Sequence, residues 1–156
     1  YRLCRAITSD GIRGQVVAIA GRNERQRRKL VANKWSVPVR VEGFVDNMDE
    51  WMRAADLLVT KAGPTTISEA LIMGLPMVLS DALPGHERSN VDYVVRGGAG
   101  VWAPRPGRVV RAIRTLLSPE SDVRARMAHC ARRLAQPDAA RRVAEVLWRI
   151  ADGTRD

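Results

Sequence analysis

The apolar residues of this chain fall into two alternating kinds of segment. Short runs rich in β-branched residues, typical of buried parallel strands, occupy 15–20, 38–45, 56–60, 76–80 and 100–103. Longer stretches with helical spacing of their apolar residues lie between them, at 23–35, 48–55, 66–73 and 87–95. This alternation predicts βαβ units and therefore an α/β fold with a Rossmann-like, doubly wound parallel sheet.

After the fifth expected strand the pattern changes to helices only. Three C-terminal helices are expected, at 105–117, 121–135 and 138–151. No internal repeat, low-complexity tract or long linker interrupts the chain. We therefore expect residues 1–156 to form a single domain.

The composition is that of a globular protein, with 46% hydrophobic and 28% charged residues. No apolar stretch is long enough to cross a bilayer, and no signal peptide is visible. Cys4 and Cys130 lie far apart and form neither a disulfide pattern nor a metal-ligand pair. These features favour a reducing, cytoplasmic setting and predict no metal site.

The formal net charge of +9 is distributed unevenly. Residues 1–34 and 105–156 carry net charges of +7 and +6, whereas residues 35–104 carry −4. Basic ends of this kind can attract nucleic acid or an anionic membrane, and the helix expected at 105–117 has an arginine at every third position. We favour the simpler interpretation, in which this helix packs its apolar side on the sheet and exposes its arginines to water.

Polar residues concentrate where the expected strands end and the next helices begin. Ligands of open parallel sheets bind at the carboxyl ends of the strands, so these junctions are the candidate site. The four junctions are AGRN (20–23), EGFVDN (42–47), TKAGPTT (60–66) and SDALPGHERSN (80–90).

The third junction has the residues of an anion site. Gly63 permits close approach to the backbone, and Pro64 fits the first turn of a helix. Thr65 and Thr66 then present hydroxyls and backbone N–H groups at a helix N-terminus, where phosphate is favoured. Thr66 with Glu69 also has the spacing of an ordinary capping box, so the residues alone leave both interpretations open.

The fourth junction places His86, Glu87 and Asn90 within five residues of one another. Such a cluster can hydrogen-bond several hydroxyl groups at once, as a sugar ligand requires. The alternative is a polar surface loop that simply starts a helix. His86 alone carries little weight, because a single loop histidine is more often structural or exposed than catalytic.

These junctions, taken in order, resemble a known family. The run VEGFVDNMDEWMRAADLLVTKAGPTTISEALIMGLPMVLSDALPGHERSNVDYVVRGGAGVW resembles the C-terminal domain of monogalactosyldiacylglycerol synthases and related processive diacylglycerol glycosyltransferases. The resemblance extends from about residue 14 to 147. More distantly, the chain is similar to the N-acetylglucosaminyltransferases that act on peptidoglycan precursors.

The resemblance implies the C-terminal half of a GT-B glycosyltransferase, which binds a UDP-sugar donor. Carried over onto this chain, the family's uracil contacts fall on Gly43, Phe44 and Val45, its ribose contact on Glu69, its diphosphate contacts on Arg22, Lys61, Ala62, Gly63, Pro64, Thr65 and Thr66, and its sugar contacts on His86, Glu87 and Asn90. The UDP-sugar is a substrate, and no permanently bound cofactor is expected.

One difference from retaining enzymes and two departures from the family refine this expectation. Retaining enzymes of the same fold often carry a glutamate eight residues before the ribose-binding one, and this chain has Lys61 there, which favours inversion. Plant-type members have Gln in place of His86, so UDP-glucose is as plausible a donor as UDP-galactose. They also have Gly in place of Thr65, which can be accommodated at ordinary helical dihedrals.

The family's acceptor site lies in an N-terminal domain that this chain does not contain. Tyr1 corresponds to a position inside the helix that follows the first strand of the C-terminal domain, so we interpret the chain as a fragment. Diacylglycerol and the catalytic base would be held by the other domain, so we assign no catalytic residue and expect the fragment alone to be inactive. The implied location is cytoplasmic and peripheral to the cytoplasmic membrane.

Two other classes of function remain open. One is a different nucleotide-sugar reaction on the same architecture, such as N-acetylglucosaminyl transfer or epimerisation. The other is a non-enzymatic basic domain that binds nucleic acid or a lipid surface. We disfavour nucleic acid, because no recognised module is present and the candidate site lies in the acidic middle segment.

Overall fold

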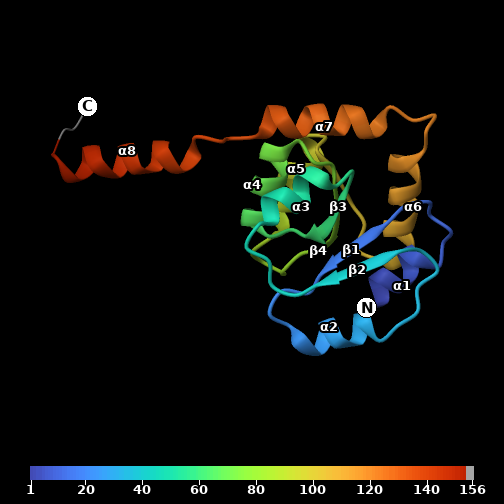
Figure 1. Ribbon diagram of the computed structural model, residues 1–156. Helices are drawn as coiled ribbons and strands as arrows, with labels where there is room; N and C mark the ends of the chain where they lie inside the picture. The colour runs from blue at the N-terminus through green and yellow to red at the C-terminus, as the bar shows by residue number, and fades with distance from the viewer. Residues whose placement is uncertain (154–156) are drawn as a thin grey trace.

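The computed structural model describes residues 1–153, in which helices and strands alternate (Figure 1). The elements are α1 (Arg2–Thr8), β1 (Val16–Ile19), α2 (Glu24–Val31), β2 (Val39–Glu42), α3 (Met48–Ala54), β3 (Leu58–Lys61), α4 (Pro64–Met73), β4 (Met77–Asp81), α5 (Arg88–Arg96), β5 (Gly100–Trp102), α6 (Pro106–Leu117), α7 (Val123–Leu134) and α8 (Ala139–Ala151). All the expected strands and helices are confirmed, with boundaries that shift by up to four residues.

Every strand pair is parallel, as the predicted fold requires. β1 pairs with β2, with Val16 opposite Val39, and β4 lies between β3 and β5, with Met77 opposite Leu58 and Gly100. Within residues 1–153 no hydrogen-bonded ladder joins these two groups of strands. The parallel α/β architecture is therefore confirmed, and its sheet consists of a two-stranded and a three-stranded part.

The central strand β4 contributes to two hydrophobic cores on opposite faces of the sheet. Met77 and Leu79 belong to the core formed with α3, α4 and α5, whereas Val78 belongs to the core formed with α1, α6 and α7. This division follows from the pleat of a strand, in which successive side chains point to opposite faces. Helices on both faces make the sheet doubly wound.

The helix α6 packs as the sequence predicts. Val109, Ile113 and Leu116 are buried in the second core, and Arg108 and Arg111 are exposed on the other side of the helix. The apolar spacing of this helix is thus explained by packing on β4 and α1.

The last helix, α8, extends away from the rest of the structure (Figure 1). None of its residues is buried, and its apolar side chains are largely exposed, with Trp148 at 74%. Among the described residues, no helix has the length and apolar character needed to span a membrane.

Candidate functional site

The four predicted junctions lie directly after β1, β2, β3 and β4 and form two groups. The junctions after β1 and β2 contact each other, and the junctions after β3 and β4 contact each other. Within residues 1–153, no hydrogen bond, ion pair or cation–π contact joins a predicted site residue of one group to one of the other. The two groups are therefore described separately.

The helix α4 begins earlier in the chain than the capping-box interpretation requires. α4 begins at Pro64, with Gly63 as its N-cap, so Thr66 is the third helical residue and does not cap it. The first helical hydrogen bond runs from Ile67 N–H to the carbonyl of Gly63. The N–H groups of Thr65 and Thr66 have no acceptor within residues 1–153, so they can bind an external anion.

Gly63 makes room for a lysine rather than for an unusual backbone angle. Its φ of −71° is accessible to any residue. A Cβ atom at this position would lie 3.3 Å from Lys61 Nζ and 3.8 Å from Glu87 Oε1. The space beside Gly63 is thus occupied by the ammonium of Lys61.

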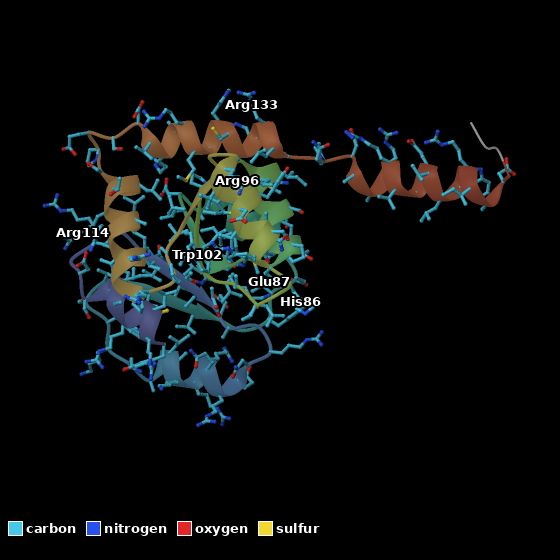
Figure 2. All side chains as sticks on the ribbon, turned by 180° about the vertical axis from the view of Figure 1, so that it is seen from behind. His86, Glu87, Arg96, Trp102, Arg114 and Arg133 are labelled. Atoms are coloured by element: carbon cyan, nitrogen blue, oxygen red, sulfur yellow. The ribbon has the colours of Figure 1, made fainter. Side chains whose placement is uncertain are left out.

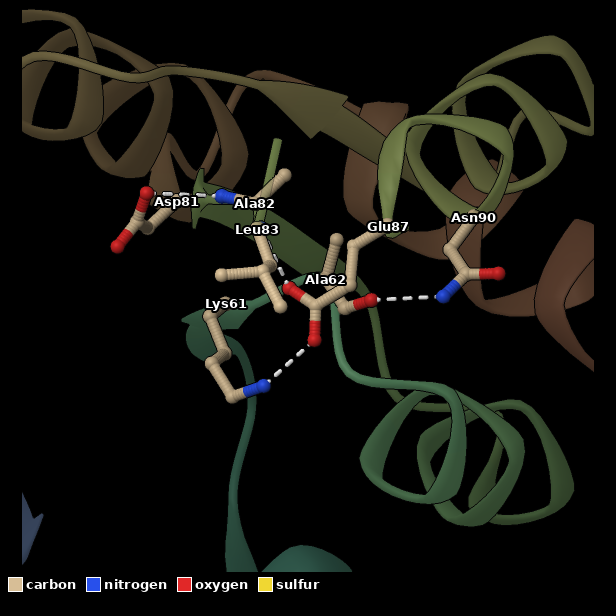
Figure 3. Close-up of polar contacts among 7 residues, drawn as sticks. All are labelled: Lys61, Ala62, Asp81, Ala82, Leu83, Glu87 and Asn90. Atoms are coloured by element: carbon tan, nitrogen blue, oxygen red, sulfur yellow. Dashed lines mark hydrogen bonds and ion pairs between the residues drawn. The ribbon is translucent and has the colours of Figure 1, made fainter. Parts of the chain in front are cut away.

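Glu87 connects the fourth junction to this turn (Figure 3). Its Oε1 lies 2.6 Å from Lys61 Nζ, and its Oε2 accepts a hydrogen bond of 2.8 Å from the backbone N–H of Leu83. The Glu87 side chain is 9% exposed, whereas that of Lys61 is 64% exposed. The hydrogen bonds from Lys61 and then Leu83 lower the pKa of Glu87 below its ordinary value of 4.5 because they stabilise the ionised carboxylate.

Asn90 contacts the same turn from the first helical turn of α5. Its side-chain Nδ2 donates a hydrogen bond of 2.9 Å to the carbonyl oxygen of Ala62 (Figure 3). The backbone N–H of Ala62 donates in turn to the carbonyl of Asp81, at 2.7 Å. The turn at Ala62 is therefore held on both sides by residues of the following strand and helix.

The other group lies after β1 and β2. The N–H groups of Ala20 and Gly21 donate to the carbonyls of Glu42 and Gly43. This places the guanidinium of Arg22 over the ring of Phe44, 4.9 Å from its centroid. Phe44 is 65% exposed, so much of its side chain is accessible to a planar ligand in addition to Arg22.

The remaining predicted residues lie at the surface. Glu69 and His86 are exposed, Val45 is half-buried, and neither Glu69 nor His86 has a side-chain hydrogen bond within residues 1–153. Figure 2 shows His86 beside Glu87 at one edge of the molecule, away from Arg114 and Arg133. The side chains of Glu69 and His86 are thus accessible to a ligand, whereas those of Lys61, Glu87 and Asn90 are engaged with one another's loops. No group of three or more metal-ligating side chains occurs in residues 1–153.

Two contributors were not predicted from the sequence. Asp81 accepts from Ala62 through its backbone and from the N–H of Ala82 through Oδ1, and Leu83 supplies a backbone N–H to Glu87. Leu83 acts through its main chain, which any residue possesses, so no residue type at that position could have revealed it. Asp81 is a polar residue directly after the apolar run expected as a strand at 76–80, so its position in the sequence could have identified it.

Comparison with known proteins assigns the fold and the family. The model of the glycosyltransferase family 28 C-terminal domain matches residues 4–143. The chain belongs to this family. The match spans β1 to β5 and most of the C-terminal helices, so both groups of junctions lie within the family 28 domain.

The predicted resemblance to monogalactosyldiacylglycerol synthases is also confirmed. The family 28 domain is 45% identical over 126 residues to the probable monogalactosyldiacylglycerol synthase 3 of Oryza sativa subsp. japonica, a match that covers 81% of this chain and 25% of that protein. The monogalactosyldiacylglycerol synthase 2 of Arabidopsis thaliana is 45% identical over the same length and 27% covered. Both relatives are chloroplastic by name, and the chain spans about a quarter of their length.

Solved structures confirm the GT-B fold. Acinetobacter baumannii MurG superimposes with a TM-score of 0.79 at 23% identity, over 95% of this chain and 45% of that one. The spinosyn rhamnosyltransferase SpnG, in complex with thymidine diphosphate, gives 0.68 at 19% identity, over 92% and 39% of the two chains. At these identities the similarity shows the fold of the family 28 domain, and the roles of its individual residues remain predictions.

Proposed function

We propose that this chain is the donor-binding half of an inverting glycosyltransferase and that residues 1–156 form a single UDP-sugar-binding domain. The observation that carries the proposal is the β3–α4 turn. The backbone N–H groups of Thr65 and Thr66, which have no acceptor within residues 1–153, lie at the N-terminus of a ten-residue helix. Lys61, whose side chain is 64% exposed, lies directly before them. This combination of donors and charge suits a diphosphate.

The other parts of the nucleotide would bind residues of α4 and of the junctions after β1 and β2. Glu69 follows Thr65 by four residues, so both lie on the same side of α4, and its exposed carboxylate can accept from the ribose hydroxyls. The uracil would lie against Gly43, Phe44 and Val45. Arg22 would then stand between the base and the phosphates.

The proposal also assigns binding sites to the donor sugar and to the acceptor. His86 lies exposed in the loop before α5 and would face the sugar of UDP-galactose or UDP-glucose. Diacylglycerol would bind a second domain, which would also supply the general base, so the chain alone would be inactive. Inversion is proposed because Lys61 occupies the position where retaining enzymes of this fold often carry a glutamate. Such an enzyme would act at the surface of the cytoplasmic membrane.

A calorimetric titration of the chain with UDP tests this proposal. We expect saturable binding by the wild type and at least about tenfold weaker binding by Glu69→Ala, because the ribose would lose a charged acceptor. Glu145→Ala on α8 is the matched control, since it removes an exposed helical glutamate far from the turn and should bind UDP normally. A folded wild-type chain that does not bind UDP would contradict the proposal. The enzyme that contains this domain can then be assayed with UDP-galactose, UDP-glucose and UDP-N-acetylglucosamine on diacylglycerol.

A further inference from the structure

The strand β5 forms one edge of the three-stranded part of the sheet. It pairs with β4, and within residues 1–153 no strand pairs with its other side. The carbonyl oxygen of Ala99 and the N–H of Ala103 bond to β4. Because the main-chain groups of successive strand residues point to opposite sides, Trp102 directs its N–H and C=O to the free edge. An edge of this kind can pair with another extended segment.

A groove of about 400 Å³ lies beside this edge, between β5 and α6. The strand lines it with Val101 and Trp102, and the helix lines it with Arg108, Arg111 and Thr115. Its volume lies in the range of about 300–1,000 Å³ that is typical of ligand sites. None of its lining residues belongs to the predicted donor site, so the groove is a separate surface.

The two arginines of the groove carry charges that the protein does not neutralise. The side chains of Arg108 and Arg111 are exposed, and within residues 1–153 neither makes a hydrogen bond, an ion pair or a cation–π contact. The helix that carries them contains no acidic residue, and Asp122, before α7, is already paired with Arg126. This side of the groove is therefore positively charged and fits a partner that carries carboxylates.

A third arginine lies on the opposite face of the same strand. Arg88, at the start of α5, has its guanidinium 6.0 Å from the centroid of the Trp102 ring and also pairs with Asp92. Its side chain is 68% exposed. Because α5 and α6 pack in the cores on opposite faces of the sheet, the free edge of β5 has basic side chains on both of its faces.

We propose that the free edge of β5 binds an extended acidic segment of a partner protein, which is added to the sheet as a further strand. The main chain of the segment would pair with Trp102. Its side chains would alternate between the two faces, so that carboxylates meet Arg108 and Arg111 on one face and Arg88 on the other. We call this surface the β5 edge site. It does not overlap the predicted donor site, so the inference goes beyond the proposed function.

The main-chain groups of Trp102 favour a peptide over an anionic membrane as the occupant. A lipid headgroup can pair with arginines, but it offers no alternating N–H and C=O groups to a strand edge. Since β5 is only three residues long, the main chain would add few hydrogen bonds, and we expect the arginines to supply much of the affinity.

A hexapeptide with carboxylates on both faces of an extended chain, acetyl-Glu-Val-Glu-Glu-Val-Glu-amide, is the probe. We expect saturable binding in an NMR titration, and at least about fivefold weaker binding by Arg108→Gln/Arg111→Gln, because two charged partners are lost. The matched control is Arg25→Gln/Arg28→Gln, which removes two exposed arginines of α2 and should bind the peptide normally. Circular dichroism first establishes that each variant is folded.

A second peptide and one amide test whether the segment is added as a strand. Replacing both valines of the peptide by proline keeps its charges but prevents regular strand pairing, and should weaken binding at least about fivefold. At saturation with the valine peptide, amide hydrogen exchange at Trp102 should become at least about fivefold slower, and exchange at Val143 of α8 should not change. Equal binding of the two peptides, or unchanged exchange at Trp102, would overturn the proposal, since the arginines would then act only as a charged surface.

Vesicles of phosphatidylcholine and phosphatidylglycerol test a membrane as the occupant. Sedimentation should recover the α6 double variant and the α2 control variant equally, because the groove would not contact the bilayer. A specific loss of vesicle binding in the α6 variant, or a folded wild-type chain that does not bind the valine peptide, would overturn the proposal. These measurements involve no UDP, so they remain decisive if the proposed function is wrong.

Discussion

The two parts of the sheet differ in how deeply they are buried. In the three-stranded part, Met77, Val78 and Leu79 of β4 are 0% exposed, with helices on both faces. In the two-stranded part, no residue of β1 or β2 is fully buried, and Val17 is 40% exposed. The packing that stabilises the fold is therefore concentrated around the central strand β4, since β3, like β1 and β2, has no fully buried residue.

This difference divides the candidate site in the same way. The turn that contains Gly63 and the loop that contains Glu87 follow strands of the buried part and are joined by hydrogen bonds and an ion pair. Arg22 and Phe44 follow strands of the exposed part and are joined to each other by one cation–π contact. We therefore expect a preformed phosphate site and a base site that adjusts to its ligand, since local opening is easier where few apolar contacts are buried.

Shortening a side chain in each part gives the largest expected contrast. Leu79→Ala removes a fully buried side chain and should lower the free energy of unfolding by about 2–5 kcal/mol. Val17→Ala removes a side chain that is 40% exposed and should cost less than about 1 kcal/mol. Urea denaturation of both variants measures the difference. Equal losses would show that the two parts of the sheet are equally well packed.

Replacing one glycine in each part of the sheet by alanine tests the same contrast, because each substitution adds a Cβ atom. A Cβ at Gly100 would lie 2.7 Å from the carbonyl oxygen of Met77 and 2.8 Å from Val94 Cγ1, so Gly100→Ala should destabilise the fold by about 1–3 kcal/mol. At Gly43 the nearest atom would be Arg27 Cδ at 3.5 Å, an ordinary contact, so Gly43→Ala should change stability by less than about 0.5 kcal/mol. Thermal unfolding of the two variants checks both values. A loss for Gly43→Ala as large as that for Gly100→Ala would mean that β2 is packed as tightly as β5.

The order of strands and helices could be predicted because each is a local pattern. The apolar run at β4 and the arginine spacing of α6 depend on neighbours a few residues away. The division of the sheet into β1–β2 and β3–β4–β5 could not be predicted, because it depends on which strands pair, and pairing joins distant parts of the chain. The interpretation of Thr66 as a capping residue was wrong, since Pro64 at the first helical position starts α4 two residues earlier.

The sequence predicted which strand-to-helix junctions form the candidate site. It did not predict which residues of these junctions contact one another. Gly63 and Pro64 predicted a tight turn into a helix, because their backbone properties are intrinsic to the residue type. The ion pair between Lys61 and Glu87 joins residues 26 positions apart, and no local pattern encodes such a distance. For this reason the sequence could place Glu87 near a ligand without indicating that its carboxylate is already occupied.

The ion pair in the buried part should make stability depend on acid pH. Hydrogen bonds from Lys61 and Leu83 lower the pKa of folded Glu87, so its contribution is complete above the ordinary value of 4.5 and is lost as the pH falls through the lower folded value. The free energy of unfolding should therefore fall more steeply below about pH 4.5 in the wild type than in Glu87→Gln. Urea denaturation at a series of pH values measures both slopes. Glu120, whose pKa is lowered by Ser118, contributes to both proteins alike, so parallel curves would show that the Glu87 contacts do not persist in solution.

The smallest effect on stability is expected at the exposed end of the site. Phe44 is 65% exposed and contacts Arg22 at the surface, so Phe44→Ala should change the free energy of unfolding by no more than about 0.5–1 kcal/mol. If the uracil stacks on this ring, the same substitution should weaken UDP binding about five- to tenfold. The binding of inorganic diphosphate should stay unchanged, because in the proposed arrangement the phosphates would lie at the other part of the sheet. Calorimetric titration with the two ligands measures this separation. Leu83→Ala is the control, because Leu83 is an apolar residue of similar exposure, 58%, that contributes to the site only through its backbone. This variant should bind both ligands as the wild type does. Parallel losses for UDP and diphosphate in Phe44→Ala would show that the two groups of junctions respond as one unit, despite the unequal burial of the strands that carry them.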